Sequence, residues 1–300
     1  AAIEAVKDSE NIDIVVLHPS NKVSEYQRKQ MTGVIKDNVL NIALKGSYDD
    51  CQRIAKELLQ ENPFNRRIIS LNSINWLRVM GQVAYYVWLT KQFTSPINVA
   101  IPSGNFGNAY SAFYGRSHGL PIQNILCSTN INDVLKRFID SGILEPKDTH
   151  PSVAPSMDIQ IPSSLERLIL DLIGDASAFY KDFTNDGKAE LNEESYKSLK
   201  HIFSSVTFND DQIKNKIRDL HSEFNVIFDP HSATSVSMAL ENKKNLTTVA
   251  VATASPEKFA NTISESIKNY QEVNIEGEEE FIELDLDFKL ITDSIKKKFS

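Results

Sequence analysis

Short apolar runs alternate with amphipathic helical patterns along most of this chain. The runs are apolar throughout instead of alternating with polar positions, as expected for strands of a parallel sheet that helices cover on both faces. The pattern therefore predicts an α/β protein with largely parallel sheets. The expected strands are 12–17, 39–44, 68–71, 97–101, 122–127, 226–228 and 246–252.

The helices between these strands carry recognisable start signals. Ser47 stands three residues before Asp50, and Ser163 stands three residues before Glu166. Both serines are therefore expected to cap a helix. A further helix over about 73–93 is rich in Tyr, Trp and Val, and we expect it to be buried on most sides.

Three stretches depart from this alternation. Residues from about 165 to 224 are polar and helical without a convincing strand, which predicts a helical insertion. Residues 273–290 mix acidic and apolar side chains and are expected to form a surface strand or an extended segment. The helical pattern at 1–7 has no capping residue before it, which implies an earlier strand from which it crosses.

Composition narrows the classes of function. The 300 residues are 41% hydrophobic and 24% charged, which is typical of a globular protein of one large or two smaller domains. A net charge of -8 argues against a nucleic-acid footprint. No apolar run is long enough for a membrane span. Cys51 and Cys127 are expected to be buried and unpaired, so we expect no metal site and a cytoplasmic location.

The most informative stretch is INVAIPSGNFGN at 97–108, an apolar strand that leads through a glycine loop into a helix at about 108–117. Gly104 and Gly107 let the backbone bend and approach a ligand, and successive amides in such a turn bind anions. The helix adds its positive end. The loop predicts a phosphate cradle, although a plain strand-to-helix turn also favours glycine and asparagine.

Eight ordered blocks extend this signal over nearly the whole chain. They are LHPSNKVS (17–24), GSYDDCQ (46–52), NSINWLR (72–78), PSGNFGN (102–108), TNIND (129–133), PSMDI (155–159), DPHSA (229–233) and TASPEKF (253–259). Together they resemble threonine synthase of the pyridoxal-phosphate family, in the form found in fungi and many bacteria.

The resemblance implies the tryptophan-synthase-β-like fold, which is pyridoxal-phosphate fold type II. Two α/β domains with mostly parallel sheets and a helical insertion then hold the cofactor between them. We expect residues 1–75 to be the remaining part of the smaller domain and 76–300 to be the large cofactor-binding domain, with the insertion at about 165–224.

The resemblance also implies a reaction. Enzymes of this type are carbon–oxygen lyases of threonine biosynthesis, which convert O-phospho-L-homoserine and water to L-threonine and phosphate. They use pyridoxal 5'-phosphate as the electron sink. Cofactor and substrate each bring a phosphate, which suits helix N-termini and oriented amides.

Cofactor-binding positions follow from matching the blocks. Gly104, Asn105, Phe106, Gly107 and Asn108 match the family's loop for the cofactor phosphate.

Thr253 matches the hydroxyl residue that contacts the pyridine nitrogen. A hydroxyl, unlike a carboxylate, would not hold that nitrogen protonated. A threonine at a strand end is also typical of a local backbone partner.

Substrate-binding positions are Asn75 and Arg78, with Lys22 as a weaker candidate for the substrate phosphate. A planar guanidinium suits a carboxylate or phosphate bidentately. The alternative for Arg78 is an arginine on the exposed side of a helix start.

Two departures from the family pattern leave two interpretations open. Ser255 stands where the family commonly has histidine, and the family's Schiff-base lysine, in a Phe-Lys-Asp setting, has no match here. Lys181, in Tyr-Lys-Asp, is expected to be solvated. Either the chain is the C-terminal two thirds of a threonine synthase, active only with an N-terminal fragment, or it is a truncated, non-catalytic phosphate-binding or interaction protein.

Overall fold

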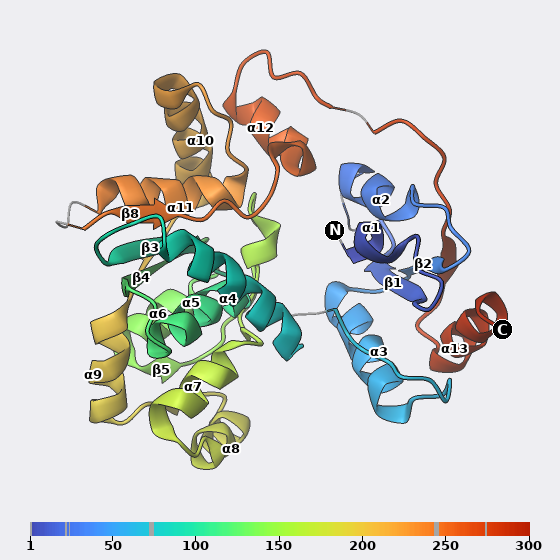
Figure 1. Cartoon of the computed structure of the whole chain (residues 1–300), viewed down its shortest axis with the longest axis horizontal. Coiled ribbons are helices and arrows are strands. Elements are labelled where there is room, and N and C mark those ends of the chain that lie inside the picture. Colours follow the sequence, from blue (N-terminus) through green and yellow to red (C-terminus); the bar gives the residue numbers. More distant parts are fainter. Residues whose placement is uncertain (1, 22, 24, 72–74, 243–245, 274) are drawn as a thin grey trace. The chain divides into compact units, whose positions relative to one another are not determined.

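The structure is a computed structural model that divides the chain into two compact units, residues 1–71 with 272–300 and residues 72–271 (Figure 1). It describes residues 2–21, 23, 25–71, 75–242, 246–273 and 275–300.

The first unit is built on a three-stranded parallel sheet in the order β1-β2-β9. All six residues of the central strand β2 are buried, which explains why five of them are apolar, with Asn41 as the exception. Strands β1, β2 and β9 are Ile14–Pro19, Val39–Leu44 and Ile282–Leu284, and the helices are α1 (Ala2–Val6), α2 (Glu25–Thr32), α3 (Tyr48–Glu61) and α13 (Phe288–Lys298).

The C-terminal residues join this first unit, whereas the sequence analysis assigned all of 76–300 to the large domain. Strand β9 pairs with β2, and Ile291 and Ile295 of α13 are buried in a cluster with Ile42 of β2. The chain therefore passes from one unit to the other near residues 72 and 272. The sequence did not predict this division, because pairing with a distant strand leaves no local signal. The expected strand within 273–290 is present only as the three residues of β9.

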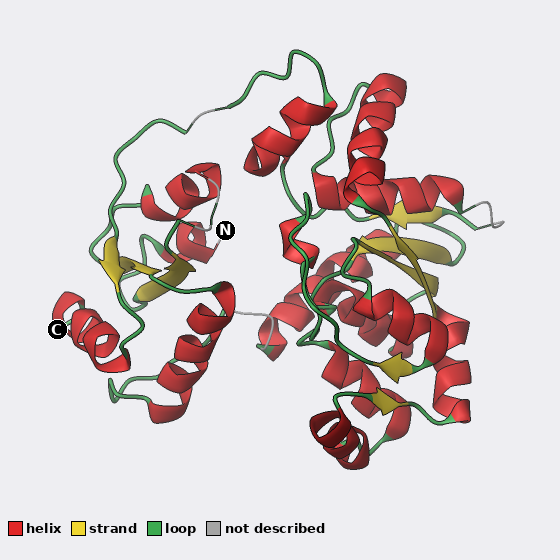
Figure 2. Ribbon diagram, turned by 180° about the vertical axis from the view of Figure 1, so that it is seen from behind, coloured by secondary structure: helices red, strands yellow, loops and turns green. Residues whose placement is uncertain are grey.

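The second unit contains a four-stranded parallel sheet in the order β7-β4-β3-β8. Figure 2 shows these strands between layers of helices. The strands are β3 (Ile97–Pro102), β4 (Ile122–Thr129), β7 (Phe203–Thr207) and β8 (Thr248–Ala250).

The two faces of this sheet carry different helices. Val99 and Ile125 face a cluster that contains Phe113 of α5, whereas Ala100 and Leu126 face Met238 of α11. Successive residues of a strand point to opposite faces, so both faces of β3 and β4 are buried. The helices of this unit are α4 (Trp76–Thr90), α5 (Gly107–Ser117), α6 (Val134–Ser141), η1 (Pro155–Met157), α7 (Leu165–Ile173), α8 (Ser177–Asp186), α9 (Glu193–Ile202), α10 (Asp210–Phe224), α11 (Pro230–Glu241), η2 (Pro256–Phe259) and α12 (Ala260–Ser266), with a small antiparallel pair of β5 (Ile143–Leu144) and β6 (Ala189–Glu190).

The prediction of a helical insertion without strands at 165–224 is wrong, because β6 lies within it and pairs with β5, and β7 lies within it and pairs with β4. Only Phe203 of this strand is buried, and the four residues after it are partly exposed. An edge strand does not need two apolar faces, so its sequence, Phe-Ser-Ser-Val-Thr, lacks the apolar run that the other strands carry.

Three further expectations differ from the structure. Residues 68–71 and 226–228 form no strand, and the second of these runs leads into the start of α11. Helix α4 is not buried on most sides, because Leu77 and Trp88 are 69% and 63% exposed.

Candidate functional site

The glycine loop between β3 and α5 leaves a helix N-terminus without a side-chain cap. Phe106 is the N-cap residue, with φ at 66°, and its side chain makes no capping hydrogen bond. The Tyr110 N–H donates to the Phe106 carbonyl at 2.8 Å. The amides that precede Tyr110 have no intrahelical acceptor, so this end of α5 can receive an anion.

Gly104 lies against the backbone of a segment far along the chain. A Cβ atom built on Gly104 would lie 2.4 Å from the carbonyl oxygen of Ser156. Real Cβ atoms do not approach oxygen so closely, so any other residue would displace either the loop or the segment at 155–157. This close approach is the reason that the position needs glycine.

A pocket of about 200 Å³ opens beside this contact. It brings together Gly104 and Thr253, two residues that the sequence analysis assigned to one site from separate blocks. Its lining residues are Pro102, Gly104, Ser156, Met157, His231, Thr253 and Ala254.

The other side chains of the loop contact the protein and not the pocket. The Asn105 Oδ1 accepts from both the N–H and the hydroxyl of Ser163, each at 3.3 Å. Phe106 is 2% exposed and packs in the core. The Asn108 Oδ1 accepts from the hydroxyls of Tyr85 and Tyr86, each at 2.6 Å. These residues can therefore offer a ligand their backbone amides, whereas their side chains fix the loop.

The contact to Asn105 also explains a failed expectation. Ser163 does not begin a capping box, because helix α7 starts at Leu165 after Ser164, and Ser164 makes no side-chain cap. Ser163 is held by the loop instead. The sequence does contain the Ser-x-x-Glu pattern, but Ser163 donates to Asn105 and does not cap the helix.

Of the predicted substrate residues that the structure describes, neither Asn75 nor Arg78 lines this pocket. The Asn75 side chain caps α4 by accepting from the Leu77 N–H at 2.9 Å. Arg78, one turn into the same helix, is exposed. Lys22 lies outside the residues that the structure describes. Lys181 is exposed on α8, as expected, and the described residues that line the pocket include no lysine.

The segment that faces Gly104 is held by two buried asparagines that follow β4. The Asn130 Nδ2 donates to Asp158 at 2.6 Å and to the Ala154 carbonyl at 3.2 Å. The Asn132 Nδ2 donates to the same Asp158 oxygen at 2.9 Å. Asn130 and Asn132 are 0% and 2% exposed. The blocks at 129–133 and 155–159 thus form one structure, although neither block indicates the other in the sequence.

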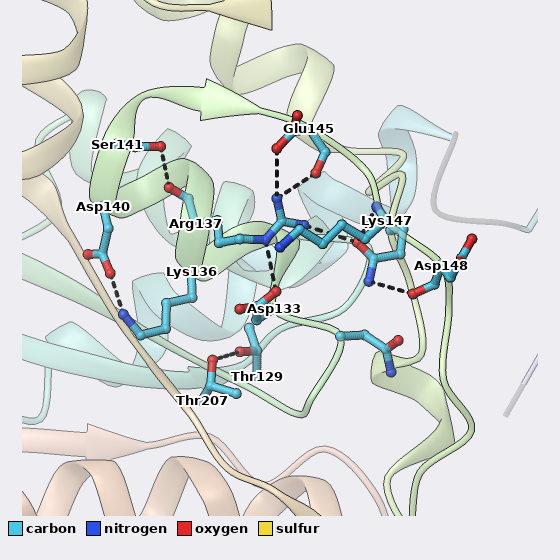
Figure 3. Close-up of polar contacts among 12 residues, drawn as sticks. Thr129, Asp133, Lys136, Arg137, Asp140, Ser141, Glu145, Lys147, Asp148 and Thr207 are labelled. Atoms are coloured by element: carbon cyan, nitrogen blue, oxygen red, sulfur yellow. Dashed lines mark hydrogen bonds and ion pairs between the residues drawn. The ribbon is translucent and has the colours of Figure 1, made fainter. Parts of the chain in front are cut away.

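Arg137 of α6 holds the beginning of the same segment (Figure 3). Its Nε donates to Asp133 at 2.9 Å and its Nη1 to the Glu145 carbonyl at 2.6 Å. The Gln160 Oε1 accepts from the Lys147 N–H at 3.2 Å, so this bond joins residues 147 and 160 of the segment. Side chains from the carboxyl end of β4 and from α6 therefore hold the chain on both sides of the pocket residues Ser156 and Met157.

The start of α11 also borders the pocket, through His231. The Asp229 side chain is completely buried and accepts from the His231 N–H and from the His231 ring Nδ1, each at 2.9 Å, and from the Ser232 hydroxyl. The Ser232 Oγ in turn accepts from the Thr253 N–H at 3.0 Å. Sequence reasoning gave His231 no role. An aspartate N-cap followed by proline was the available signal for a helix start.

Burial keeps the thiols of Cys51 and Cys127 and the phenol of Tyr86 neutral. Burial raises the pKa of the Cys127 thiol to about 12 and that of Cys51 to about 11, so both stay protonated and unreactive. Burial also raises the pKa of Tyr86, which therefore donates to Asn108 as a neutral phenol. The described residues contain no cluster of His, Cys, Asp or Glu that could hold a metal ion. None of the helices in the described ranges is both long and apolar enough to span a membrane.

Comparison with known proteins extends these observations. A family model described as "Pyridoxal-phosphate dependent enzyme" matches residues 9–254. The chain is 37% identical over 278 residues to a threonine synthase of Pseudomonas aeruginosa, which covers 89% of this chain but 59% of that protein. The chain therefore spans less than two thirds of the length of such curated relatives.

Two solved structures share the fold. A threonine synthase from Brucella melitensis with bound pyridoxal phosphate superposes with a TM-score of 0.87 at 29% identity, over 99% of this chain and 68% of that one. The threonine synthase from yeast gives a TM-score of 0.87 at 26% identity, over 99% and 67%. These similarities confirm the predicted fold class.

Proposed function

The chain belongs to the family of pyridoxal-phosphate dependent enzymes, and on this basis we propose that it carries the cofactor site of a threonine synthase. The reaction is the conversion of O-phospho-L-homoserine and water to L-threonine and phosphate. The observation that carries the proposal is the pocket in which Gly104 and Thr253, matched separately to family positions, lie together.

The residues present fit the cofactor. The uncapped start of α5 and the amides of 104–108 suit a phosphate dianion, and Gly104 leaves the backbone accessible. Thr253 is exposed at the pocket, where its hydroxyl would contact the pyridine nitrogen. When bound, the cofactor supplies an electron sink for proton transfers on the substrate.

For the substrate, we propose the start of α4. Arg78 is exposed there, and its guanidinium suits the phosphate or carboxylate of O-phosphohomoserine. Asn75 fixes the start of that helix through its cap. Lys22 is proposed as a further phosphate contact.

The lysine that bonds the cofactor is proposed to lie in the N-terminal part of the longer relatives, because the described pocket lining includes none. Catalysis would then require that part, on the same polypeptide or as a separate fragment. The first test uses this chain with pyridoxal 5'-phosphate, borohydride and intact-mass measurement. We expect reversible binding without a covalent adduct, and an adduct on this polypeptide would contradict the assignment of the lysine.

The second test measures phosphate release from O-phosphohomoserine, with and without the N-terminal part of a relative. Release only in the complemented sample supports the proposal. Cofactor binding without release in either sample favours the alternative of a non-catalytic phosphate-binding protein. In the active sample, Arg78→Ala should raise KM far more than it changes the cofactor absorbance, and the opposite pattern would assign Arg78 to the cofactor or to packing.

A further inference from the structure

A continuous chain of hydrogen bonds joins two walls of the pocket, one at Ser156 and the other at Thr253, through the first turn of α11. On one side, the Ser156 N–H donates to the His231 Nε2 at 3.1 Å. On the other side, the Thr253 N–H donates to the Ser232 Oγ at 3.0 Å. Both His231 and Ser232 donate to the same buried carboxylate, that of Asp229.

We propose that His231 is a positioning residue for the cofactor site, which holds the wall at Ser156 in register with Thr253 through Asp229. Ser156 is the residue whose carbonyl packs against Gly104. A shift of this wall therefore moves the residue that borders the phosphate loop. The proposal rests on the proposed function, since it takes the pocket as the cofactor site.

The ring can do this in one tautomer only. Its Nε2 accepts an amide proton, so it carries none, and its Nδ1 lies 2.9 Å from the Asp229 oxygen and donates to it. The His231 side chain is 4% exposed and that of Asp229 is 0% exposed. Phe259 packs against the ring with centroids 4.8 Å apart. The ring's bond to Asp229 is buried, so its loss leaves a polar group without a partner, whereas its bond to the Ser156 N–H is partly buried.

The second arm of this chain of hydrogen bonds, from Asp229 through Ser232 to Thr253, also depends on one group that both donates and accepts. The Ser232 Oγ accepts from the Thr253 backbone while its own proton goes to Asp229. A hydroxyl is the simplest group that both donates and accepts at one atom. The arm fixes the backbone at Thr253, so the Thr253 hydroxyl remains available to the pocket.

Two amide substitutions separate the two bonds of the imidazole. Asparagine places its amide near Nδ1, so His231→Asn keeps the donor to Asp229 and removes the acceptor of Ser156. Glutamine reaches the position of Nε2, so His231→Gln can keep that acceptor. We expect His231→Asn to weaken pyridoxal 5'-phosphate binding about tenfold and His231→Gln to stay within about threefold of the original chain.

The experiment measures cofactor binding by absorbance titration and, on the same samples, peptide-level amide hydrogen exchange. His231→Asn should accelerate exchange at 155–157, and His231→Gln should restore protection. In the second arm, Ser232→Ala should accelerate exchange at 252–254, and Ser232→Thr should restore it. Ser205→Ala is the matched control, because its hydroxyl bonds to the Cys127 carbonyl within the sheet at 2.7 Å and it does not line the pocket.

Equal binding by the original chain and by His231→Asn, or equal losses in both His231 variants, would overturn the positioning role. If the original chain binds no pyridoxal 5'-phosphate, the proposed function fails separately. Hydrogen exchange then decides the inference alone, and unchanged protection of 155–157 in His231→Asn overturns it.

Discussion

Gly104 is the position at which the site tolerates a side chain least. An added methyl group would meet the Ser156 carbonyl at 2.4 Å, and this atom is backbone, so it cannot rotate away. We predict that Gly104→Ala weakens pyridoxal 5'-phosphate binding by about tenfold or more and lowers the free energy of unfolding by about 1–3 kcal/mol. Absorbance titration and urea unfolding measure the two effects.

Gly81 provides the matched control. It lies within α4, and a Cβ built there has no heavy atom within 4 Å. Gly81→Ala should raise stability by about 0.5–1 kcal/mol, because alanine restricts the unfolded chain and favours the helix. Undiminished cofactor binding by Gly104→Ala would remove the loop from the site.

For the candidate site, the sequence predicted residues that belong to a recognisable local pattern, such as Gly104, which lines the pocket, and did not indicate those that act through distant contacts. Gly104 lies in a strand–glycine–helix motif that can be interpreted without a structure. Ser156 and His231 form their bond across 75 positions of sequence, and nothing within either block indicates the other. The prediction that Ser163 caps a helix failed for the same reason, since Ser163 donates to Asn105, which is distant in sequence.

At the scale of elements, helix starts give a direct comparison of local and tertiary signals. Ser47 and Asp50 form a complete capping box on α3, with the Asp50 N–H donating to the Ser47 Oγ at 3.2 Å. We predict that Ser47→Ala lowers the free energy of unfolding of the first unit by about 1 kcal/mol. Chemical denaturation with hydrogen exchange over 48–61 measures it.

Ser164→Ala is the corresponding test on α7, where the N-cap residue makes no side-chain cap to the first turn. The Ser164 Oγ accepts from the Arg167 side chain at 3.0 Å, but there is no hydrogen bond to a backbone N–H to lose, so exchange over 165–173 should change less than exchange over 48–61 does in Ser47→Ala. Equal acceleration of both helices would show that the capping hydrogen bond is not what stabilises α3.

The strands show why part of the fold could not be predicted from the sequence. The buried strands β2, β3 and β4 have apolar runs that predict them directly, because both faces are covered. The edge strands β7 and β9 are short and partly exposed, and their sequences, Phe-Ser-Ser-Val-Thr and Ile-Glu-Leu, include polar or acidic residues. Their pairing with β4 and β2 depends on tertiary contacts that periodicity cannot report.

The attachment of the C-terminal segment to α2 predicts a dependence on pH. Arg28 donates to both oxygens of Glu279, at 2.9 and 3.0 Å, and the Thr32 hydroxyl adds a bond at 2.7 Å. These contacts lower the pKa of Glu279 from 4.5 to about 2. A carboxylate with a depressed folded pKa stabilises the fold above its unfolded pKa. This stabilisation should be lost as the pH falls from about 4.5 to about 2.

Glu279→Gln should therefore reduce stability at pH 7 and flatten the acid dependence of unfolding in that window. Urea unfolding of the first unit at several pH values measures both. Glu278→Gln removes the same charge from an exposed neighbour and should leave the dependence intact. A parallel acid profile for Glu279→Gln and the original chain would contradict the role of the ion pair.

At the scale of the whole molecule, the first unit is assembled from the two ends of the chain, whereas the second is continuous. Every residue that lines the pocket belongs to the second unit. The first unit depends on β9 and α13, because Ile291 and Ile295 are 0% and 6% exposed within its core. Each unit has its own hydrophobic core, so the two are expected to lose structure separately.

A chain that ends at Gln271 tests this division. Removal of β9 and α13 leaves one edge of β2 unpaired and exposes the apolar side chains that Ile291 and Ile295 cover, so the first unit should unfold. Hydrogen exchange should become fast over 39–44 and stay slow over 97–102 and 122–129. Ile291→Ala is the graded version, and a buried isoleucine truncated to alanine should cost that unit about 2–5 kcal/mol. Loss of protection in all three strands together would show that the cores unfold as one, and that the pocket depends on the C-terminal helix.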